Sequence, residues 1–391
     1  MPKGFTAAGT AAGIKKNEKK ALALIFCEKP APVAGVFTRN RVTAACVALD
    51  RKRLAESGVC QAIIVNSGNA NCCTGDAGMA DALAMADAAA SALGIDTHHV
   101  MVASTGVIGQ RLPVQKVEKA VPELAASLAS DGFSDFAESI MTTDTHPKVV
   151  TRQGDINGAA FTVTGVAKGA GMIRPDMATM LCFVCTDIGI GREALQSIVA
   201  ETNEKSFNRI TIDGDTSTND TLLVLASGMS DAHITTEGHK AAFGKLMEEV
   251  LVTLAKMVVK DGEGATKLVE ISVINARSDE DAKKIADTVA NSNLVKTAFF
   301  GEDANWGRIV AAMGRSGVDF AFDRVDICFN EVRLVQNGLY AGPDAEKAAS
   351  EVLKLPEFTI VLDMKSGDGE AVVWTCDFSL DYVRINADYR S

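Results

Sequence analysis

The sequence predicts a layered α/β protein with a second, smaller α/β domain at its C-terminal end. In the first part of the chain, short β-branched runs alternate with helical patterns, as residues 61–65 and 76–93 illustrate. The strand-like runs are almost continuously apolar, which is typical of sheets whose outer faces are covered by helices. From about residue 275 onward, strand and helix patterns repeat on their own. Because 391 residues exceed one typical core, we place a large domain at 1–274 and a smaller one at 275–391.

Strands and helices alternate in the first 130 residues. We predict strands at residues 33–37, 45–49, 61–65 and 99–103. The helix predicted over 76–93 has Thr74 available at its start and stops at Gly94. A second helix is expected after Pro113, with Pro122 interrupting its apolar face.

The pattern becomes richer in strands from residue 147 onward. In the large domain we predict strands at 148–154, 158–168, 180–187 and 221–228, with helices at 193–204 and 236–260. Toward the C-terminus we predict a helix at 279–291 and strands at 267–276, 325–330, 356–363 and 369–377.

The composition argues against several classes of protein. The net charge is −11, and Lys and Arg are never concentrated as a nucleic-acid-binding surface requires. The densest basic run, KKNEKK at residues 15–20, is interpreted as a solvated turn. No run reaches the roughly 18 apolar residues of a membrane helix, and the N-terminus lacks the apolar segment of an export signal. We therefore expect a cytoplasmic protein that binds neither nucleic acid nor a membrane.

Cysteine and histidine usage fits that compartment and indicates no metal site. Nine cysteines, an odd number, lie mostly inside apolar runs and are interpreted as reduced core residues. Cys182 and Cys185 form a CxxC within LCFVC, which we assign to a core strand because no second pair accompanies it. The five histidines are scattered, and none stands at metal-ligand spacing.

Residues 168–181, KGAGMIRPDMATML, join a glycine- and proline-rich approach directly to an apolar run. Ala178 is small, so the carbonyl of the Ala178–Thr179 bond is open to the threonine hydroxyl. An N-to-O acyl shift there would cut the chain and leave Thr179 with a free α-amine beside its own Oγ. That pair is a nucleophile and a base in one residue. From these residues alone, a threonine that simply starts a strand remains the ordinary interpretation.

The sequence resembles the ornithine acetyltransferase family of arginine biosynthesis, also called glutamate N-acetyltransferase. The resemblance extends over nearly the whole length in eight ordered blocks, and it is their number and order that make it specific. The blocks are IVNSGNANCCTG (64–75), VASTGVIGQRLP (102–113), IMTTDTHPK (140–148), AKGAGMIRPDMATMLCFVCTD (167–187), SFNRITIDGDTSTNDT (206–221), KDGEGATK (260–267), VKTAFFGEDANWGRI (295–309) and DYVRINADYRS (381–391).

The resemblance implies a self-cleaving enzyme with an α-β-β-α sandwich fold of the ornithine acetyltransferase type. Cleavage between Ala178 and Thr179 would give chains 1–178 and 179–391, which pair and assemble as a heterotetramer. Thr179 would take the acetyl group of N-acetylornithine as an ester and pass it to glutamate in a ping-pong reaction. No cofactor is expected; whether acetyl-coenzyme A serves as a second acetyl donor is left open by the sequence.

The same resemblance assigns the site residues. Thr105 and Gly106 would form the oxyanion hole, whose donors are each worth roughly 3–4 kcal/mol. The residues implied to bind substrate are Thr142, Lys168, Thr179, Glu263, Asn386 and Ser391. Without the resemblance, Thr105 and Gly106 are interpreted as a strand-ending turn and Lys168 as a surface lysine. The segment DGEG, which contains Glu263, is then a helix stop, and Ser391 is a chain end. The residues given structural roles are Asp215, Asn219, Asn305, Trp306 and Arg308.

Two departures from the family pattern and two rival functions accompany this assignment. Arg174 and Asp176 place an ion pair's worth of charge shortly before Thr179, and Ser391 ends the chain where threonine is usual. The main alternative is an autoprocessing N-terminal-nucleophile amidohydrolase or aminopeptidase, in which water clears the acyl group. The other is an acidic binding protein with an uncut chain.

Overall fold

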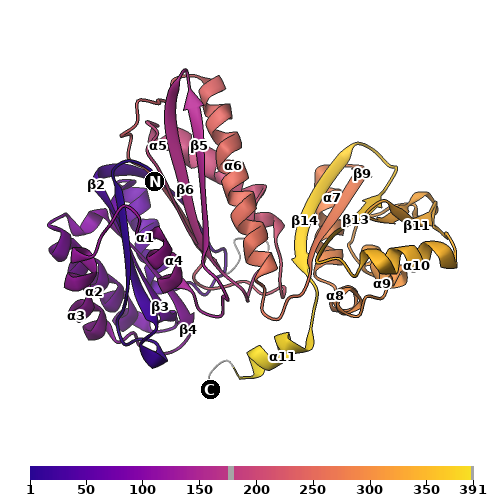
Figure 1. Cartoon of the computed structure of the whole chain (residues 1–391), viewed down its shortest axis with the longest axis horizontal. Coiled ribbons are helices and arrows are strands. Elements are labelled where there is room, and N and C mark those ends of the chain that lie inside the picture. Colours follow the sequence, from indigo (N-terminus) through magenta and orange to yellow (C-terminus); the bar gives the residue numbers. More distant parts are fainter. Residues whose placement is uncertain (175–179, 389–391) are drawn as a thin grey trace. The chain divides into compact units, whose positions relative to one another are not determined.

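The computed structural model describes residues 1–174 and 180–388, which form two compact units (Figure 1). The first unit comprises Met1–Asn208 and Asp215–Val258, and the second comprises Arg209–Gly214 and Val259–Ser391. The sequence analysis placed its boundary at 274/275, inside strand β9 (Leu268–Ala276). Because β9 pairs along its length with β13 (Glu357–Asp363) and β14 (Gly369–Cys376), the whole strand belongs to the second unit.

The first unit is built on an eight-stranded sheet with the order β4-β3-β2-β8-β7-β6-β5, to which β1 adds by pairing with β2. Strand β2 joins two halves of this sheet, one containing β3 and β4 and the other containing β5 to β8. Its first part pairs with β3, and residues 33–37 pair with β8. The strands are β1 (Phe5–Ala11), β2 (Lys20–Phe37), β3 (Val59–Asn69), β4 (Val100–Val107), β5 (Lys148–Ile156), β6 (Ala159–Lys168), β7 (Leu181–Thr186) and β8 (Thr221–Ala226). The helices are α1 (Ala45–Glu56), α2 (Gly75–Leu93), α3 (Val114–Ala126), α4 (Phe133–Ile140), α5 (Arg192–Glu204) and α6 (Glu237–Lys260).

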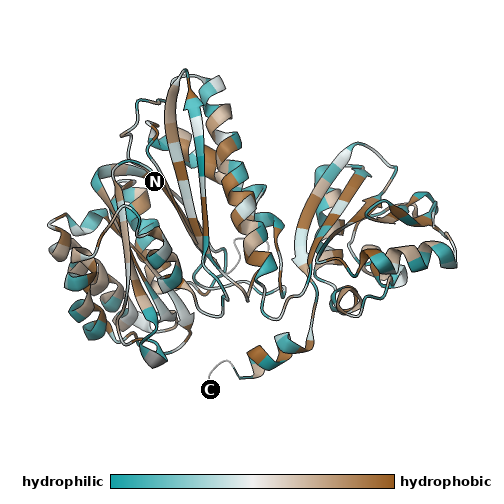
Figure 2. Cartoon of the chain, viewed as in Figure 1, coloured by the Kyte–Doolittle hydropathy of each residue, from teal (hydrophilic) through white to brown (hydrophobic). Residues whose placement is uncertain are grey.

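Both faces of this sheet are buried, which gives the unit its layers. In β3, Ile63 and Val65 enter a core shared with Phe183 of β7 and Phe136 of α4, so the two sheet halves share one core. The alternate residues of β3 enter a second core with helices α1, α2 and α3. Helix α6 lies against the other half, where Gly165 of β6 closely faces its side chains. The hydropathy colouring of Figure 2 shows these apolar runs along the strands. The predicted α-β-β-α sandwich is confirmed.

The β5–β6 hairpin fixes the register near the ends of these two strands. Asn157 and Gly158 both have positive φ, 55° and 85°, as a two-residue type I′ turn requires. The resulting register runs without a shift from this turn to the pair Lys148–Ala167. Lys148 of β5 is therefore placed beside the last residues of β6.

Residues 45–49 were predicted as a strand, and this prediction is wrong: they begin helix α1. A five-residue apolar run does not distinguish the two periods. Here Cys46, Leu49, Asp50 and Arg53 are buried at helical spacing. By contrast, the helix expected at 76–93 is confirmed as α2, and Gly94 ends it in the left-handed conformation with φ 68°. The CxxC cysteines are both buried in β7, as predicted.

The second unit is a six-stranded sheet with the order β12-β11-β10-β13-β9-β14. Its strands alternate between buried and partly exposed residues, and one core holds the buried side chains together with those of α7, α8, α9 and α10. Asn305 caps α9 by accepting a hydrogen bond from the Arg308 backbone amide, and Trp306 stacks on Tyr340. The remaining elements are α7 (Asp279–Ala290), α8 (Asn293–Phe300), α9 (Trp306–Gly314), β10 (Asp326–Phe329), β11 (Val332–Gln336), β12 (Leu339–Tyr340), α10 (Pro343–Val352) and α11 (Leu380–Ala387).

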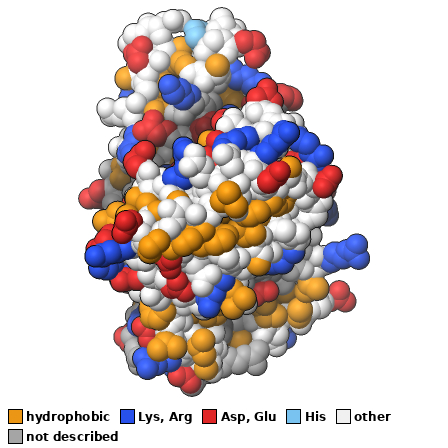
Figure 3. All heavy atoms as spheres, turned by 90° about the vertical axis from the view of Figure 1, so that its right-hand side faces the viewer, with side chains coloured by type: hydrophobic (Ala, Val, Ile, Leu, Met, Phe, Trp, Pro, Cys, Tyr) orange, Lys and Arg blue, Asp and Glu red, His pale blue; other side chains and the backbone are white. Residues whose placement is uncertain are grey.

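The surface carries a mixture of charged and hydrophobic side chains. Acidic and basic side chains are interspersed on the face drawn in Figure 3, which is also crossed by hydrophobic side chains. Among the described helices, none combines the length and the apolar character that crossing a bilayer would require.

The shared core of the first unit provides a stability test. Phe183 is fully buried and makes an edge-on contact with Phe136, with ring centroids 5.5 Å apart. Replacing Phe183 by Ala should lower the free energy of unfolding by about 3–5 kcal/mol, because it leaves a cavity between the sheet halves. Urea denaturation followed by circular dichroism measures this loss. The exposed Val42 is the control, and Val42→Ala should change stability by no more than about 0.5 kcal/mol. Equal effects of the two substitutions would contradict the assignment of this core.

Candidate active site

Three of the predicted site residues come together in the first unit. The ammonium of Lys168 lies 3.0 Å from Oγ1 of Thr142 and 3.4 Å from Oγ1 of Thr105. Lys168 is the last residue of β6, Thr105 lies near the end of β4, and Thr142 follows α4. Lys168 and Thr105 are buried, so the ammonium is held among hydroxyl groups away from bulk water.

Gly106 is placed where no other residue fits. Its φ is 130°, and a Cβ at this position would lie 2.3 Å from the carbonyl carbon of Gly68. Gly68 is its partner in the parallel pairing of β3 and β4. The close approach of two backbones therefore requires glycine and fixes the end of β4, including Thr105.

Buried amides hold the same strand ends in place. Asn219 donates hydrogen bonds to the carbonyls of Ser104 and Ala70, at 2.8 and 2.7 Å. The hydroxyl of Ser104 donates to Asn66, whose amide in turn donates to the carbonyl of Asn69. Asn219 thus fixes the residue before Thr105, which is consistent with the structural role expected for it.

A buried carboxylate, Asp144, lies beside this group. Its Oδ1 accepts hydrogen bonds from Lys148 Nζ at 2.8 Å and from the Gly169 amide at 2.6 Å. Its Oδ2 accepts from the Thr142 amide at 3.0 Å and lies 4.0 Å from Lys168 Nζ. Burial alone raises the pKa of Asp144, but the charges of Lys168 and Lys148 outweigh it and hold the pKa below its usual value.

Lys15 adds a third ammonium. Its Nζ donates to the carbonyls of Lys20 and Met141, at 2.8 and 2.7 Å. Burial and the charge of Lys168 lower the pKa of Lys15 to about 8. The interpretation of residues 15–20 as a solvated turn is thus wrong for Lys15, because its long side chain reaches back across the fold.

The chain enters the sheet next to this cluster immediately after residue 179. Met180 donates its amide to Asp220 at 3.0 Å, and Leu181 pairs with both Lys168 and Thr221. Burial raises the pKa of Asp220 well above its usual value, although the hydrogen bond from Met180 opposes this shift. Ala178, Thr179, Asp176 and Ser391 lie outside the described residues, and Arg174 is exposed.

Two other predicted residues meet in the second unit. The side-chain amide of Asn386, on α11, donates to Glu263 Oε2 at 2.8 Å, and Glu263 is buried. The loop that carries Glu263 is held by Asp377, which accepts from the amide and the hydroxyl of Thr266 at 2.8 and 2.6 Å. Gly264 has φ 70° and packs closely against the backbone of Tyr382. The structure therefore fixes Glu263 and Asn386 as a pair.

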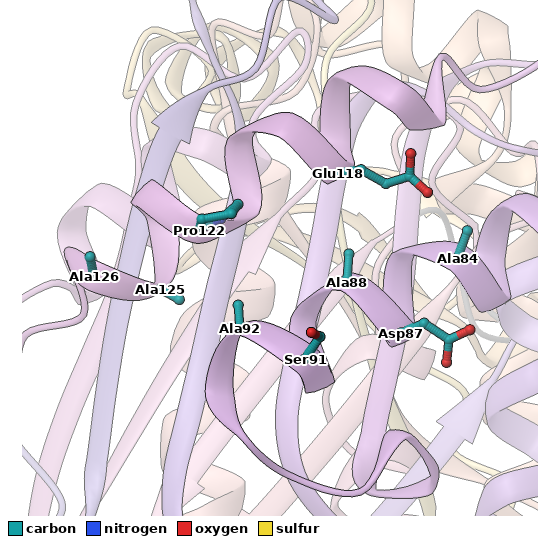
Figure 4. A pocket seen from close by; sticks show the side chains of 9 residues that line it. All are labelled: Ala84, Asp87, Ala88, Ser91, Ala92, Glu118, Pro122, Ala125 and Ala126. Atoms are coloured by element: carbon teal, nitrogen blue, oxygen red, sulfur yellow. The ribbon is translucent and has the colours of Figure 1, made fainter.

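Two hollows of the first unit differ in chemistry. The first is a small cavity at the cluster, lined among others by Thr105, Lys168, Met180, Ser217, Asn219 and Asp220. The second lies between α2 and α3, where alanines are accompanied by Asp87 and Glu118 (Figure 4). Only the first contains residues predicted to act in the reaction.

The sequence model of the ArgJ family matches residues 6–391. The chain belongs to the ArgJ family. It is similar to the arginine biosynthesis bifunctional protein ArgJ of Geobacter sulfurreducens, with 52% identity over 100% of this chain and 99% of that protein. The ArgJ protein of Caldanaerobacter subterraneus subsp. tengcongensis is 50% identical, over 100% of this chain and 98% of its own.

A crystal structure of ArgJ from Bacillus halodurans resembles part of the chain. It is 39% identical, with a TM-score of 0.50, and it covers 51% of this chain and 95% of its own. Membership of the ArgJ family makes the protein an acyltransferase of arginine biosynthesis.

Sequence reasoning missed four charged residues of this ArgJ-family site: Lys15, Asp144, Lys148 and Asp220. Asp144 and Lys148 stand inside the block IMTTDTHPK at a spacing of four residues, which was a usable signal for an ion pair. Asp220 follows Asn219 directly at the start of a buried strand, where a carboxylate is unusual. Lys15 carried no comparable signal, because its contacts with Met141 depend on the tertiary fold.

Gly106 provides a test of the strand end. Gly106→Ala should lower the free energy of unfolding by about 3 kcal/mol or more, because the new Cβ would collide with the backbone of Gly68. Gly109→Ala is the matched control: φ there is 82° and no atom lies within 4 Å of the added Cβ. It should cost only about 1–2 kcal/mol of backbone strain. Thermal unfolding of both variants measures the difference, and equal losses would show that the close approach is not what requires glycine.

Proposed function

We propose that this acyltransferase moves the acetyl group of N2-acetylornithine to glutamate through an acetyl ester on Thr179. The observation that carries this proposal is the convergence of Thr105, Thr142 and Lys168 at the point where the chain enters β7. In the sequence, Thr179 is two residues before Leu181, and Leu181 pairs with Lys168. The names of the curated relatives, which place them in arginine biosynthesis, support this choice of substrates.

We propose further that the chain cuts itself between Ala178 and Thr179. The Oγ of Thr179 attacks the carbonyl of Ala178, the peptide nitrogen leaves as the α-amine, and water hydrolyses the ester. The crystallised Bacillus halodurans polypeptide supports this. The match between the two includes 95% of that polypeptide but only 51% of this chain. That polypeptide is thus about half as long, as the predicted chains 1–178 and 179–391 would be.

Acetyl transfer then needs an acceptor for one proton and donors for one oxyanion. The α-amine of Thr179 takes the proton of its own hydroxyl as Oγ attacks the acetyl carbonyl. Thr105 and Gly106 donate hydrogen bonds to the oxygen that becomes negative, in a buried setting where such bonds are strong. Ornithine leaves with the proton, and the amino group of glutamate attacks the ester in the second half of the cycle.

The substrate-binding roles follow from charge. Lys168 and Thr142 suit the α-carboxylate that both substrates carry, because they offer an ammonium and a hydroxyl 3.0 Å apart. Glu263 offers a carboxylate to an amino group, with Asn386 orienting it. Ser391 retains its proposed role in substrate binding. No cofactor is proposed.

Three broader features complete the proposal. The relatives are named bifunctional, which supports acetyl-coenzyme A as a second acetyl donor for glutamate. The two processed chains form a pair, and two pairs form a heterotetramer. The protein acts in the cytoplasm, where its nine free cysteines stay reduced.

Thr179 is tested by mass measurement. The wild-type protein should give two polypeptides that meet at 178/179, whereas Thr179→Ala should give one intact chain with activity reduced about 10³-fold or more. Thr142→Ala is the control, because it removes a hydroxyl from the binding group and should leave cleavage intact while raising KM. An intact wild-type chain that transfers acetyl groups would refute the role of Thr179.

The fate of the acetyl group separates transfer from hydrolysis. With acetyl-labelled N-acetylornithine and glutamate, label should appear on N-acetylglutamate. Without glutamate, ornithine release should stop after one equivalent per site, because the ester then persists. NMR of the labelled carbon follows both reactions. Continuous release of free acetate would instead identify an N-terminal-nucleophile amidohydrolase.

A further inference from the structure

We infer that Asp144 is a positioning residue for acetyl transfer: its carboxylate holds Lys168 and Thr142 where they bind the substrate carboxylate. The inference rests on the proposed function, in which those two residues contact the substrate. Asp144 is not among the described residues that line the hollow beside Thr105, so it acts through its neighbours.

The geometry of Asp144 joins three separate segments. Oδ1 receives the Lys148 ammonium at the start of β5 and the Gly169 amide after β6, at 2.8 and 2.6 Å. Oδ2 receives the Thr142 amide at 3.0 Å and lies 4.0 Å from Lys168 Nζ. One buried carboxylate thus holds Thr142 by its backbone amide and lies beside the side chain of Lys168.

The peptide before Thr142 is held from the opposite side. Lys15 donates to the carbonyl of Met141 at 2.7 Å, while Asp144 accepts the amide of Thr142. Both groups of one peptide unit are therefore bound by charged side chains, which fixes the orientation of the backbone that carries Thr142.

Charge around Lys168 explains why a carboxylate is needed. Four titratable groups from different elements act on this part of the described structure: Lys15 before β2, Asp144 after α4, Lys148 of β5 and Asp220 before β8. Burial raises the pKa of the Asp220 carboxyl well above its usual value. Lys15 is affected by the charge of Lys168, and the ammonium groups of Lys168 and Lys148 both face the negative charge of Asp144. Without it, like charges would face one another and Lys168 would lose its proton at a lower pH.

Asp144→Asn tests this in the full, processed protein. The amide keeps the shape and can still accept a hydrogen bond from Thr142, but it removes the charge. The measured quantity is the ratio of variant to wild-type kcat/KM for N-acetylornithine from pH 7 to 9.5, because titration of the substrate cancels in the ratio. The ratio should fall by about twofold or more toward high pH, because loss of the neighbouring negative charge favours the unprotonated form of Lys168. The loss should lie mainly in KM.

Lys148→Met is the matched variant, since it removes a cation from the same carboxylate. Asp144 then interacts with Lys168 without competition from Lys148. The ratio of variant to wild-type kcat/KM should therefore stay level or rise with pH. Lys16→Met, at an exposed lysine of the neighbouring turn, controls for a change of charge in general and should give a level ratio. Should Asp144→Asn fail to fold, the double variant with Lys148→Met carries the test, because its ratio relative to Lys148→Met alone should fall with pH.

A level ratio for Asp144→Asn, with only its thermal stability reduced, would overturn the inference and leave Asp144 a structural ion-pair residue. A falling ratio for Lys148→Met would also overturn it, because the sign would be wrong. These outcomes presuppose an active wild-type protein. A wild-type protein that transfers no acetyl group to glutamate overturns the proposed function together with the inference.

Discussion

One buried negative charge organises the end of the first unit where Lys168 and Thr142 lie. A carboxylate is unfavourable inside a protein unless it is paired and hydrogen-bonded, and Asp144 satisfies this with two lysines and two backbone amides. The chain segments that supply these partners lie at residue 142, residue 148 and residues 168–169. Their convergence depends on the β5–β6 hairpin, whose Asn157–Gly158 turn sets the register of both strands.

The packing of the sheet makes this end rigid. Strands buried on both faces leave little freedom for their terminal residues, and the low aromatic content of 5% lets small side chains bring backbones close together. Gly68 and Gly106 show how close two strands come. A hydroxyl and an ammonium carried by such strands need little reorganisation when a charge develops nearby, which is the condition for effective electrostatic stabilisation.

The sequence predicted the regular elements and the fold class well. It did not predict the group of charged residues around Asp144. Helix α2 was predictable because its alanine-rich pattern ends at a glycine in the left-handed conformation. Residues 45–49 were mistaken for a strand because five apolar residues fit either period. Thr105, Gly106, Thr142 and Lys168 were assigned through the family resemblance and not through spacing. Lys15 was missed because its partner Met141 lies across the fold, whereas the four-residue spacing of Asp144 and Lys148 was a signal that went unused.

The order of strands in the first sheet determines how the two polypeptides would depend on each other after processing. Strands β7 and β8 come from the C-terminal side of the 178/179 bond, and on the sheet they separate β2 from β6, which both come from the N-terminal side. Each fragment therefore lacks strands that the other must insert. Fragments synthesised from two separate genes would have to intercalate while folding, whereas a single precursor would assemble the sheet before the proposed cleavage.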